Sequence, residues 1–174
     1  MLSLLKNLTL ARGAGLMALA CVGMLAFGMY LQHVVGLEPC PMCIVQRYAL
    51  ILVAMFAMGT WTLGLKDAKN GTVGMGQKVF AALALLWAAG GAFVAARQSF
   101  LQWYPPEVLS CGRDFYGMVE TFPLKRAIPM IFKGSGDCSK VDWTLLGGSI
   151  ANWSFVAFVA MAVALLVLLV RRGR

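Results

Sequence analysis

Residues 153–170 read WSFVAFVAMAVALLVLLV and contain no charged side chain. A helix needs about 20 mainly apolar residues to cross a bilayer core of about 30 Å, so this stretch predicts a transmembrane helix. Three more stretches have the same character, at about residues 13–31, 44–65 and 79–96, and the only charge inside them is Arg47. The chain is therefore predicted to be an all-α membrane protein built as a bundle of four transmembrane helices.

The composition supports this fold class. Of the 174 residues, 60% are hydrophobic and 13% are charged, whereas soluble domains average about 45–50% and about 25%. These values exclude an ordinary soluble enzyme and a disordered chain, and the length predicts one integral membrane domain over residues 1–174. The net charge of +8 on so apolar a chain indicates basic flanks of membrane helices rather than a nucleic-acid-binding surface.

The distribution of Lys and Arg predicts the orientation, because basic residues collect on the cytoplasmic side of a membrane. The two termini and the connection at about 66–78 together hold eight basic residues against the single acid Asp67. The loops at about 32–43 and 97–152 contain no such excess. Both termini are therefore expected in the cytoplasm, and the second outer loop, rich in apolar residues, is expected to carry a short helix on the membrane surface.

Four of the five cysteines fall in the two outer loops. Cys40 and Cys43 lie in the first, and Cys111 and Cys138 lie in the second. In this orientation they face an oxidising compartment, where disulfides persist. Four cysteines allow three pairings. In one pairing each loop contains its own disulfide, and this is the obvious resting arrangement. In the other two pairings both disulfides join the two loops. Cys21 lies in the middle of the first span and is expected to be a packing residue.

The first cysteine pair opens the second predicted span. Pro41 suits the first position of a helix, which places Cys43 in the first turn. A helix N-terminus and a neighbouring cation both favour the thiolate form of a cysteine, and Arg47 follows Cys43 by four residues on the same helix face. Cys40 and Cys43 could instead form a structural disulfide or half of a zinc site, and Arg47 could be a snorkelling anchor. Cys111 and Cys138 could likewise be a staple of a surface loop.

Taken together, these features resemble the DsbB family of bacterial inner-membrane proteins. The most specific matches are residues 39–47 (PCPMCIVQR), residues 101–105 (LQWYP), and Ser135-Gly136-Asp137-Cys138 with Trp143 beyond them. The resemblance implies a dithiol:quinone oxidoreductase that reoxidises a periplasmic DsbA-like thiol oxidase and passes the electrons to membrane quinone, with ubiquinone favoured over menaquinone. It also implies a monomeric multi-pass protein of the inner membrane with no bound metal.

The resemblance also implies residue roles. Cys111 would form the mixed disulfide with the partner and displace Cys138, which would then attack Cys40. This would release Cys43 as a thiolate beside the quinone, with Arg47 near a quinone carbonyl. Many relatives carry a His where this chain has Gln98, which can donate a hydrogen bond to a quinone oxygen but cannot transfer a proton.

Some relatives carry Glu where this chain has Gln46, and this difference is expected to matter little. Two other readings of the chain stay open at this point. One is an enzyme similar to vitamin K epoxide reductase, although in that family the C-x-x-C motif lies late in the bundle. The other is a non-catalytic membrane protein with structural disulfides or a zinc site.

Overall fold

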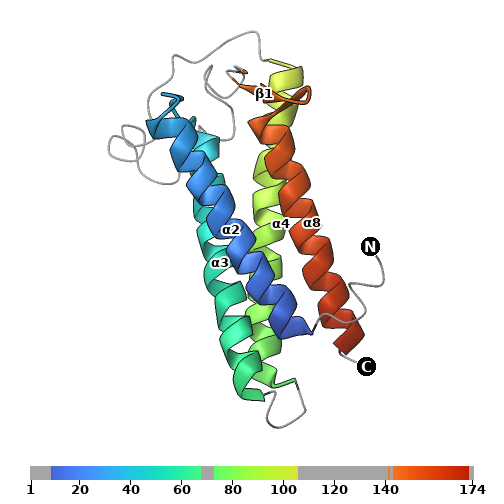
Figure 1. Ribbon diagram of the computed structural model, residues 1–174. Helices are drawn as coiled ribbons and strands as arrows, with labels where there is room; N and C mark the ends of the chain where they lie inside the picture. The colour runs from blue at the N-terminus through green and yellow to red at the C-terminus, as the bar shows by residue number, and fades with distance from the viewer. Residues whose placement is uncertain (1–8, 68–72, 106–140, 142, 173–174) are drawn as a thin grey trace, which may run out of the picture.

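The chain runs up and down through four long antiparallel helices in a computed structural model that describes residues 9–67, 73–105, 141 and 143–172. All four helices are long and apolar enough to cross a membrane, as predicted. Figure 1 shows the elements in chain order: α2 (Leu10–His33), α3 (Pro41–Asp67), α4 (Met75–Trp103), β1 (Thr144–Leu145), β2 (Gly148–Ser149) and α8 (Ile150–Arg172).

Each helix extends beyond its apolar run, and the difference matters most for α4. The sequence predicts a loop from about residue 97, but α4 continues to Trp103. It stops there because Pro105 follows Tyr104, and the residue before a proline is pushed out of the helical region. Tyr104 accordingly has φ −128° and ψ 76°. Gln98 therefore lies inside α4 rather than beyond its end.

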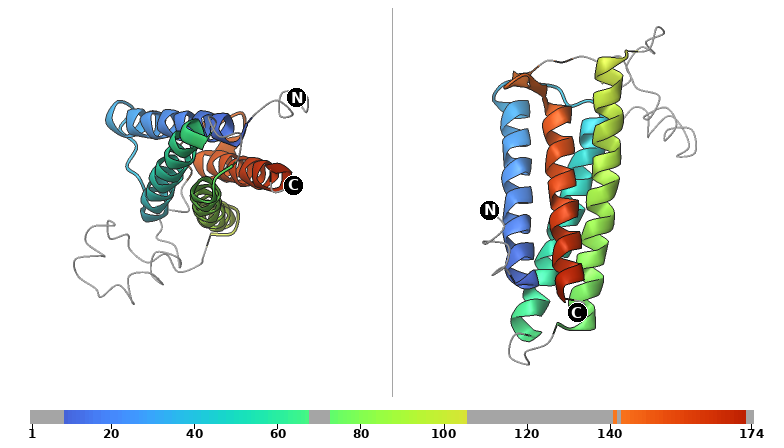
Figure 2. Two further views of the ribbon diagram at one scale, coloured as in Figure 1. Left: turned by 90° about the horizontal axis from the view of Figure 1, so that it is seen from below. Right: turned by 90° about the vertical axis from the view of Figure 1, so that its right-hand side faces the viewer.

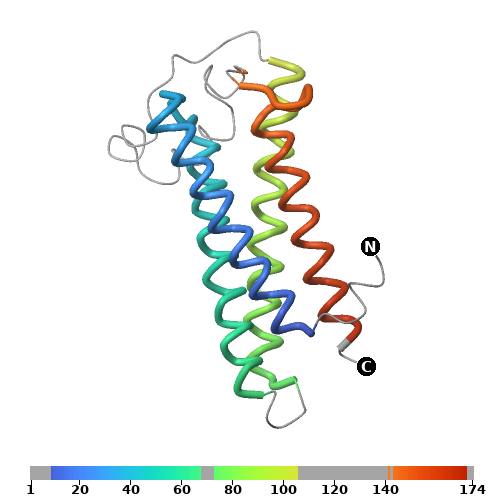
Figure 3. Tube along the Cα trace, in the orientation of Figure 1, coloured from blue at the N-terminus to red at the C-terminus, as the bar shows by residue number. Residues whose placement is uncertain are grey.

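The helix ends fall into two groups. The start of α2, the end of α3, the start of α4 and the end of α8 lie together at one end of the bundle (Figure 3). The C-x-x-C motif and the strands lie at the opposite end, which we call the sulfur end. The basic residues Arg12, Lys66, Lys78 and Arg171 belong to the first group.

Small residues line the inward faces of the two central helices. On α3 and α4 the buried positions recur every three or four residues, as expected where backbones approach closely in a membrane. They include Met42, Gln46, Ala49, Val53, Ala57, Thr60 and Gly64 on α3, and Ala81, Ala84, Ala88, Gly91, Ala95 and Gln98 on α4. The outward faces carry large apolar side chains such as Met55, Leu86 and Phe93, each more than half exposed, which suits contact with lipid.

The four helices do not pack equally. α3 packs against both α2 and α4, and α4 packs against α8, whereas α2 and α8 share few contacts. Near the basic end α2 approaches α8 closely, and a Cβ added to Gly13 would meet the Leu168 side chain. Toward the sulfur end the two helices diverge, as Figures 1 and 2 show.

A short β-hairpin, which the sequence analysis does not anticipate, precedes α8. β1 and β2 pair antiparallel with Thr144 opposite Ser149, and the turn residues Leu146 and Gly147 have φ values of 52° and 80°. Positive φ at both turn positions is the geometry of a two-residue hairpin turn. Trp153 on α8 holds the hairpin, because its Nε1–H donates a hydrogen bond of 2.9 Å to the Leu145 carbonyl oxygen.

Ser149 joins the hairpin to two helices. Its Oγ accepts a hydrogen bond of 3.3 Å from the Asn152 backbone N–H, which caps the start of α8, and its hydroxyl donates to Gln102 Oε1 on α4. The short surface helix expected in the second outer loop falls on residues that lie outside the described part of the chain.

The contact between Gly91 of α4 and Phe158 of α8 provides a test of the packing. Phe158, almost fully buried, lies against Gly91, where an added Cβ would collide with its ring, whereas a Cβ on the adjacent Gly90 would meet nothing within 4 Å. We expect Gly91→Ala to lower the free energy of unfolding by about 1–3 kcal/mol, as overpacking does. Thermal unfolding in detergent measures the effect. Gly90→Ala is the matched control and should leave the melting temperature unchanged or slightly raised; equal melting temperatures for the two variants would contradict the packing.

Candidate functional site: a sulfur pair at a helix start facing an apolar cavity

Cys40 and Cys43 build the first turn of α3. Pro41 is the first helical residue, as predicted, and the Cys40 carbonyl oxygen accepts the first helical hydrogen bond, from the Ile44 N–H at 3.2 Å. Cys40 Sγ accepts a second bond, from the Cys43 backbone N–H at 3.4 Å, so the Cys40 side chain acts as the helix cap. The two sulfur atoms lie 3.0 Å apart, so they would need to move only a little closer to reach the disulfide bond length of about 2.05 Å.

Two buried glutamines adjoin the sulfur atoms. Gln98 Nε2 on α4 lies 3.3 Å from Cys40 Sγ and 3.2 Å from Cys43 Sγ, and it donates to both. Gln98 Oε1 in turn accepts a hydrogen bond of 2.6 Å from Gln46 Nε2 on α3. The resemblance predicts Gln98 as a quinone ligand and assigns no role to Gln46. The structure shows that both belong to one hydrogen-bonded group with the cysteines.

Arg47 is fastened to α2. Its guanidinium donates to Gln32 Oε1 and, at 3.1 Å, to the Gly28 carbonyl oxygen, and it also lies 4.0 Å from Met29 Sδ. A charge inside a membrane helix is costly unless it has such partners. The side chain is only half-buried and lines the same cavity as Cys43, in keeping with their spacing of four residues.

A cavity of about 600 Å³ at the sulfur end is lined by residues of α2, α3, α4 and α8. A volume of a few hundred Å³, mainly apolar walls and a few polar groups are typical of small-molecule sites. The polar or charged groups on the wall include Gln32, Glu38, Cys40, Cys43, Gln46, Arg47, Gln98 and Gln102, and the apolar groups include Met24, Phe27, Leu31, Leu50, Trp143, Leu145, Trp153 and Phe158.

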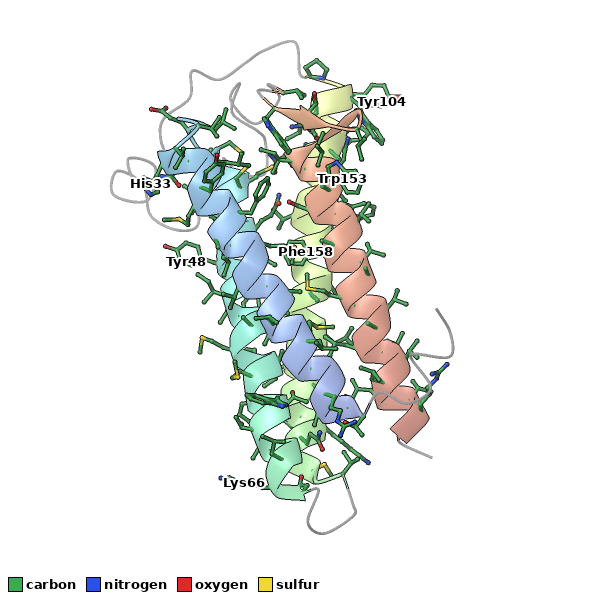
Figure 4. All side chains as sticks on the ribbon, in the orientation of Figure 1. His33, Tyr48, Lys66, Tyr104, Trp153 and Phe158 are labelled. Carbon is green, nitrogen blue, oxygen red and sulfur yellow. The ribbon has the colours of Figure 1, made fainter. Side chains whose placement is uncertain are left out.

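Aromatic side chains form part of the cavity wall. Trp143 packs edge-on against Phe27 of α2, with ring centroids 5.9 Å apart, and the hairpin residue Leu145 lies beside it on the wall. Figure 4 shows Phe158 pointing into the bundle from the middle of α8 and Trp153 near the sulfur end of the same helix. Tyr48, by contrast, points away from the bundle (Figure 4) and is half exposed.

The structure thus brings together four of the six predicted site residues: Cys40, Cys43, Arg47 and Gln98. The other two, Cys111 and Cys138, lie outside the described residues. Cys21 lies apart from the site, fully buried against Met161, with the two sulfur atoms 3.5 Å apart.

Sequence reasoning missed Gln46 and Gln32 as site residues. A signal for Gln46 existed, because this residue falls on the inward stripe of α3 in register with Ala49 and Val53. A polar side chain at such a position needs an internal partner. No comparable signal marks Gln32, whose partner is set by how α2 lies against α3.

Comparison with known proteins gives a consistent result. The family model described as "Disulfide bond formation protein DsbB" matches residues 11–168. "Disulfide bond formation protein B" of Acidovorax sp. (strain JS42) is 68% identical over 163 residues, covering 91% of this chain and 87% of that protein. The protein of the same name from Polaromonas naphthalenivorans (strain CJ2) is 68% identical over 159 residues, covering 91% and 90%. A third, from Azoarcus sp. (strain BH72), is 52% identical over 152 residues, covering 87% of each. The chain belongs to the DsbB family of disulfide bond formation proteins.

Proposed function

We propose that this membrane disulfide-generating oxidoreductase receives electrons from a periplasmic DsbA-like thiol oxidase at Cys111 and Cys138 and delivers them through Cys40 and Cys43 to a quinone in the apolar cavity. The observation that carries the proposal is the placement of the sulfur pair, which borders a cavity of about 600 Å³ lined also by Arg47. A reactive dithiol, a cation and an apolar chamber in a membrane bundle are the parts that such a transfer needs.

The exchange begins in the outer loops. A reduced partner cysteine attacks Cys111, the Cys111–Cys138 bond breaks, and Cys138 leaves with the electron pair as a thiolate. Cys138 then attacks Cys40, which breaks the Cys40–Cys43 bond and leaves Cys43 as a thiolate. Val141, which lies three residues after Cys138 in the sequence, lines the same cavity as Cys40, which supports this step.

The second half of the exchange restores the outer pair. The partner's second cysteine displaces Cys111 and thereby completes the partner's disulfide. Cys111 then attacks Cys138 and displaces Cys40, so that two electrons have moved to Cys40 and Cys43. A quinone bound in the cavity would be the oxidant of this reduced pair. It would take up two electrons and two protons to become a quinol, and Cys40 and Cys43 would again form a disulfide.

The residues around the cavity suit a quinone. A quinone head has an apolar ring face and two carbonyl oxygens that accept hydrogen bonds, and the wall offers aromatic side chains beside the Arg47 guanidinium. Arg47 carries five N–H donors and keeps its charge, so it can hold a ring oxygen while α2 holds Arg47. We assign the main quinone contact to Arg47 rather than to Gln98, because the Gln98 amide already bonds both sulfur atoms and Gln46.

We further propose that the quinone is ubiquinone. A DsbA-type partner is a strong oxidant, near −120 mV, so its regeneration requires a still stronger one. Ubiquinone, a benzoquinone, is a stronger oxidant than menaquinone, a naphthoquinone. The working unit is proposed to be a monomer, in which Cys40, Cys43 and Arg47 of one chain border one cavity.

The basic end of the bundle is proposed to face the cytoplasm, which puts the sulfur end in the periplasm. Among the described residues, Arg12, Lys66, Lys78 and Arg171 lie at or near the helix ends of that group. This charge excess supports the assignment, because basic flanks are retained on the cytoplasmic side.

The first prediction concerns the cysteines. Replacing any one of Cys40, Cys43, Cys111 or Cys138 with Ser should lower turnover on the order of a hundredfold or more, because each step needs a thiolate nucleophile or leaving group. The measurement follows ubiquinone-1 absorbance with reduced partner and the full-length protein in detergent micelles. Cys21→Ala is the matched control and should retain turnover. Wild-type-like turnover of Cys43→Ser would overturn the proposal and favour a structural disulfide.

The second prediction concerns Arg47. Removing its charge in Arg47→Met should raise the KM for ubiquinone-1 roughly tenfold to a hundredfold, the range for a lost hydrogen bond to a charged group. Arg97→Met is the control, since Arg97 lies on α4 near the sulfur end but stacks over Phe100, 5.7 Å from the ring centroid, and is not part of the cavity wall. The same KM in both variants would remove Arg47 from the quinone site.

The third prediction concerns orientation. Alkaline phosphatase, which is active only outside the cytoplasm, should be inactive when fused after Arg174 and active when fused after Tyr104, because α4 ends at the sulfur end. Green fluorescent protein fused at the same two positions should show the opposite pattern. An active phosphatase after Arg174 would reverse the assigned orientation.

A further inference from the structure

Two amide side chains form a relay that ends on the sulfur pair. Gln46 Nε2 donates to Gln98 Oε1 at 2.6 Å, and Gln98 Nε2 donates to Cys40 Sγ and Cys43 Sγ at 3.3 and 3.2 Å. The relay crosses from α3 to α4 and back to the start of α3. It therefore connects Gln46 with the sulfur atoms through Gln98.

Burial makes the relay strong. Gln46 is 4% exposed and Gln98 is 3% exposed, so little water competes for their hydrogen bonds. In such surroundings a hydrogen bond is electrostatically stronger than in water, and consecutive bonds polarise one another. The donors of Gln98 consequently act on the sulfur atoms with little screening.

The orientation of the Gln98 amide decides whether it stabilises or destabilises a thiolate at the sulfur pair. With the nitrogen toward the sulfur atoms, the amide presents donors to them. Turned over, it would present Oε1, an acceptor that repels the lone pairs of a thiolate. In this structure Gln46 holds the first orientation, because its Nε2 donates to Gln98 Oε1 and thereby leaves Gln98 Nε2 toward the sulfur atoms.

We propose that Gln46 is a positioning residue that, by holding the Gln98 amide, stabilises the reduced form of the Cys40–Cys43 pair and so makes this pair a stronger oxidant. The inference rests on the proposed function, which assigns this pair a redox role. Gln98 contacts the reacting sulfur atoms, whereas Gln46 acts through Gln98.

The chemistry follows from the charge that appears when the disulfide opens. An incoming thiolate forms a new bond to Cys40 Sγ, the Cys40–Cys43 bond breaks, and its electron pair stays on Cys43 Sγ. A hydrogen bond from an amide to an anion is about twice as strong as one to a neutral acceptor. The donors of Gln98 therefore favour the opened, reduced pair over the closed one, and stabilising the reduced form raises the reduction potential.

The chain contains its own control for this argument. Gln77 lies on α4, as Gln98 does, and is also 3% exposed, but it packs near Gly64 at the basic end of the bundle. Replacing Gln77 with Met tests the general cost of exchanging a buried amide for an apolar side chain of similar size. It leaves the sulfur end intact.

The experiment measures the reduction potential of the inner pair in the full-length protein without quinone. Cys111→Ser, Cys138→Ser and Cys21→Ala are combined so that only Cys40 and Cys43 titrate, and thiol trapping follows equilibration with dithiothreitol buffers in detergent micelles. We expect Gln46→Met to make the pair about tenfold easier to oxidise, which is about 30 mV for a two-electron couple. Gln77→Met should change it less than about twofold, the scatter expected of a distant, independent site.

A double variant tests whether Gln46 acts through Gln98. Gln98→Met should produce at least the shift of Gln46→Met, and adding Gln46→Met to Gln98→Met should change nothing further. Two independent effects that add would overturn the relay, as would a shift in Gln46→Met no larger than that in Gln77→Met. If Gln46→Met does not fold, Gln46→Ala carries the same expectation, because small residues such as Ala49 line this face of α3.

The proposed function and the relay can be disproved by different results. Wild-type protein that cannot pass electrons from a reduced partner to ubiquinone-1 would overturn the function, whatever the potentials are. Wild-type turnover together with unchanged potentials in the Gln46 variants would overturn the relay alone.

Discussion

The close approach of α3 and α4 determines where the two glutamines beside the sulfur pair lie. Alanines and glycines on the inward faces allow the two backbones to come near each other, and the same three-and-four spacing places Gln46 and Gln98 at the end of these stripes. In lipid the interior of a bundle is no more apolar than its surroundings, so packing and internal hydrogen bonds hold helices together. The glutamines contribute both, since they occupy packed positions and bond across the interface.

The cavity, by contrast, lies where two helices separate. α2 and α8 diverge toward the sulfur end, and the hairpin and Trp143 cover the space between them. Arg47 reaches across to α2 and bonds Gln32 and Gly28, so the charge that we propose for quinone binding also ties two walls of the cavity together. One chain thus combines a tight helix pair, which fixes the sulfur atoms, with an open pair, which leaves room for a ligand.

The sequence predicts a large part of this arrangement. Hydropathy alone gives the four spans, because lipid demands long apolar stretches, and Pro41 gives the start of α3. It does not give the last turns of α4, where Arg97, Gln98 and Gln102 look like loop residues although only Pro105 ends the helix. The sequence does not predict the hairpin either, because its strands of two residues are too short to show an alternating pattern of apolar and polar residues.

The candidate site is likewise only partly predictable from the sequence. Cys40, Cys43 and Arg47 can be found from spacing along one helix, since residues four apart share a face. Gln46 and Gln32 cannot be assigned roles by such a rule, because their partners lie on other helices and depend on how those helices are placed. The roles of Cys111 and Cys138 rest on the family alone.

The amide relay has one more consequence. Neither a glutamine amide nor a guanidinium gains or loses a proton within the pH range in which proteins are folded. The groups that donate hydrogen bonds at the sulfur end therefore keep the same charge in acidic and in alkaline surroundings. On the cavity wall, the groups that can respond to such a change include the Glu38 carboxyl and the two thiols, whereas the amide donors that contact the sulfur atoms cannot respond.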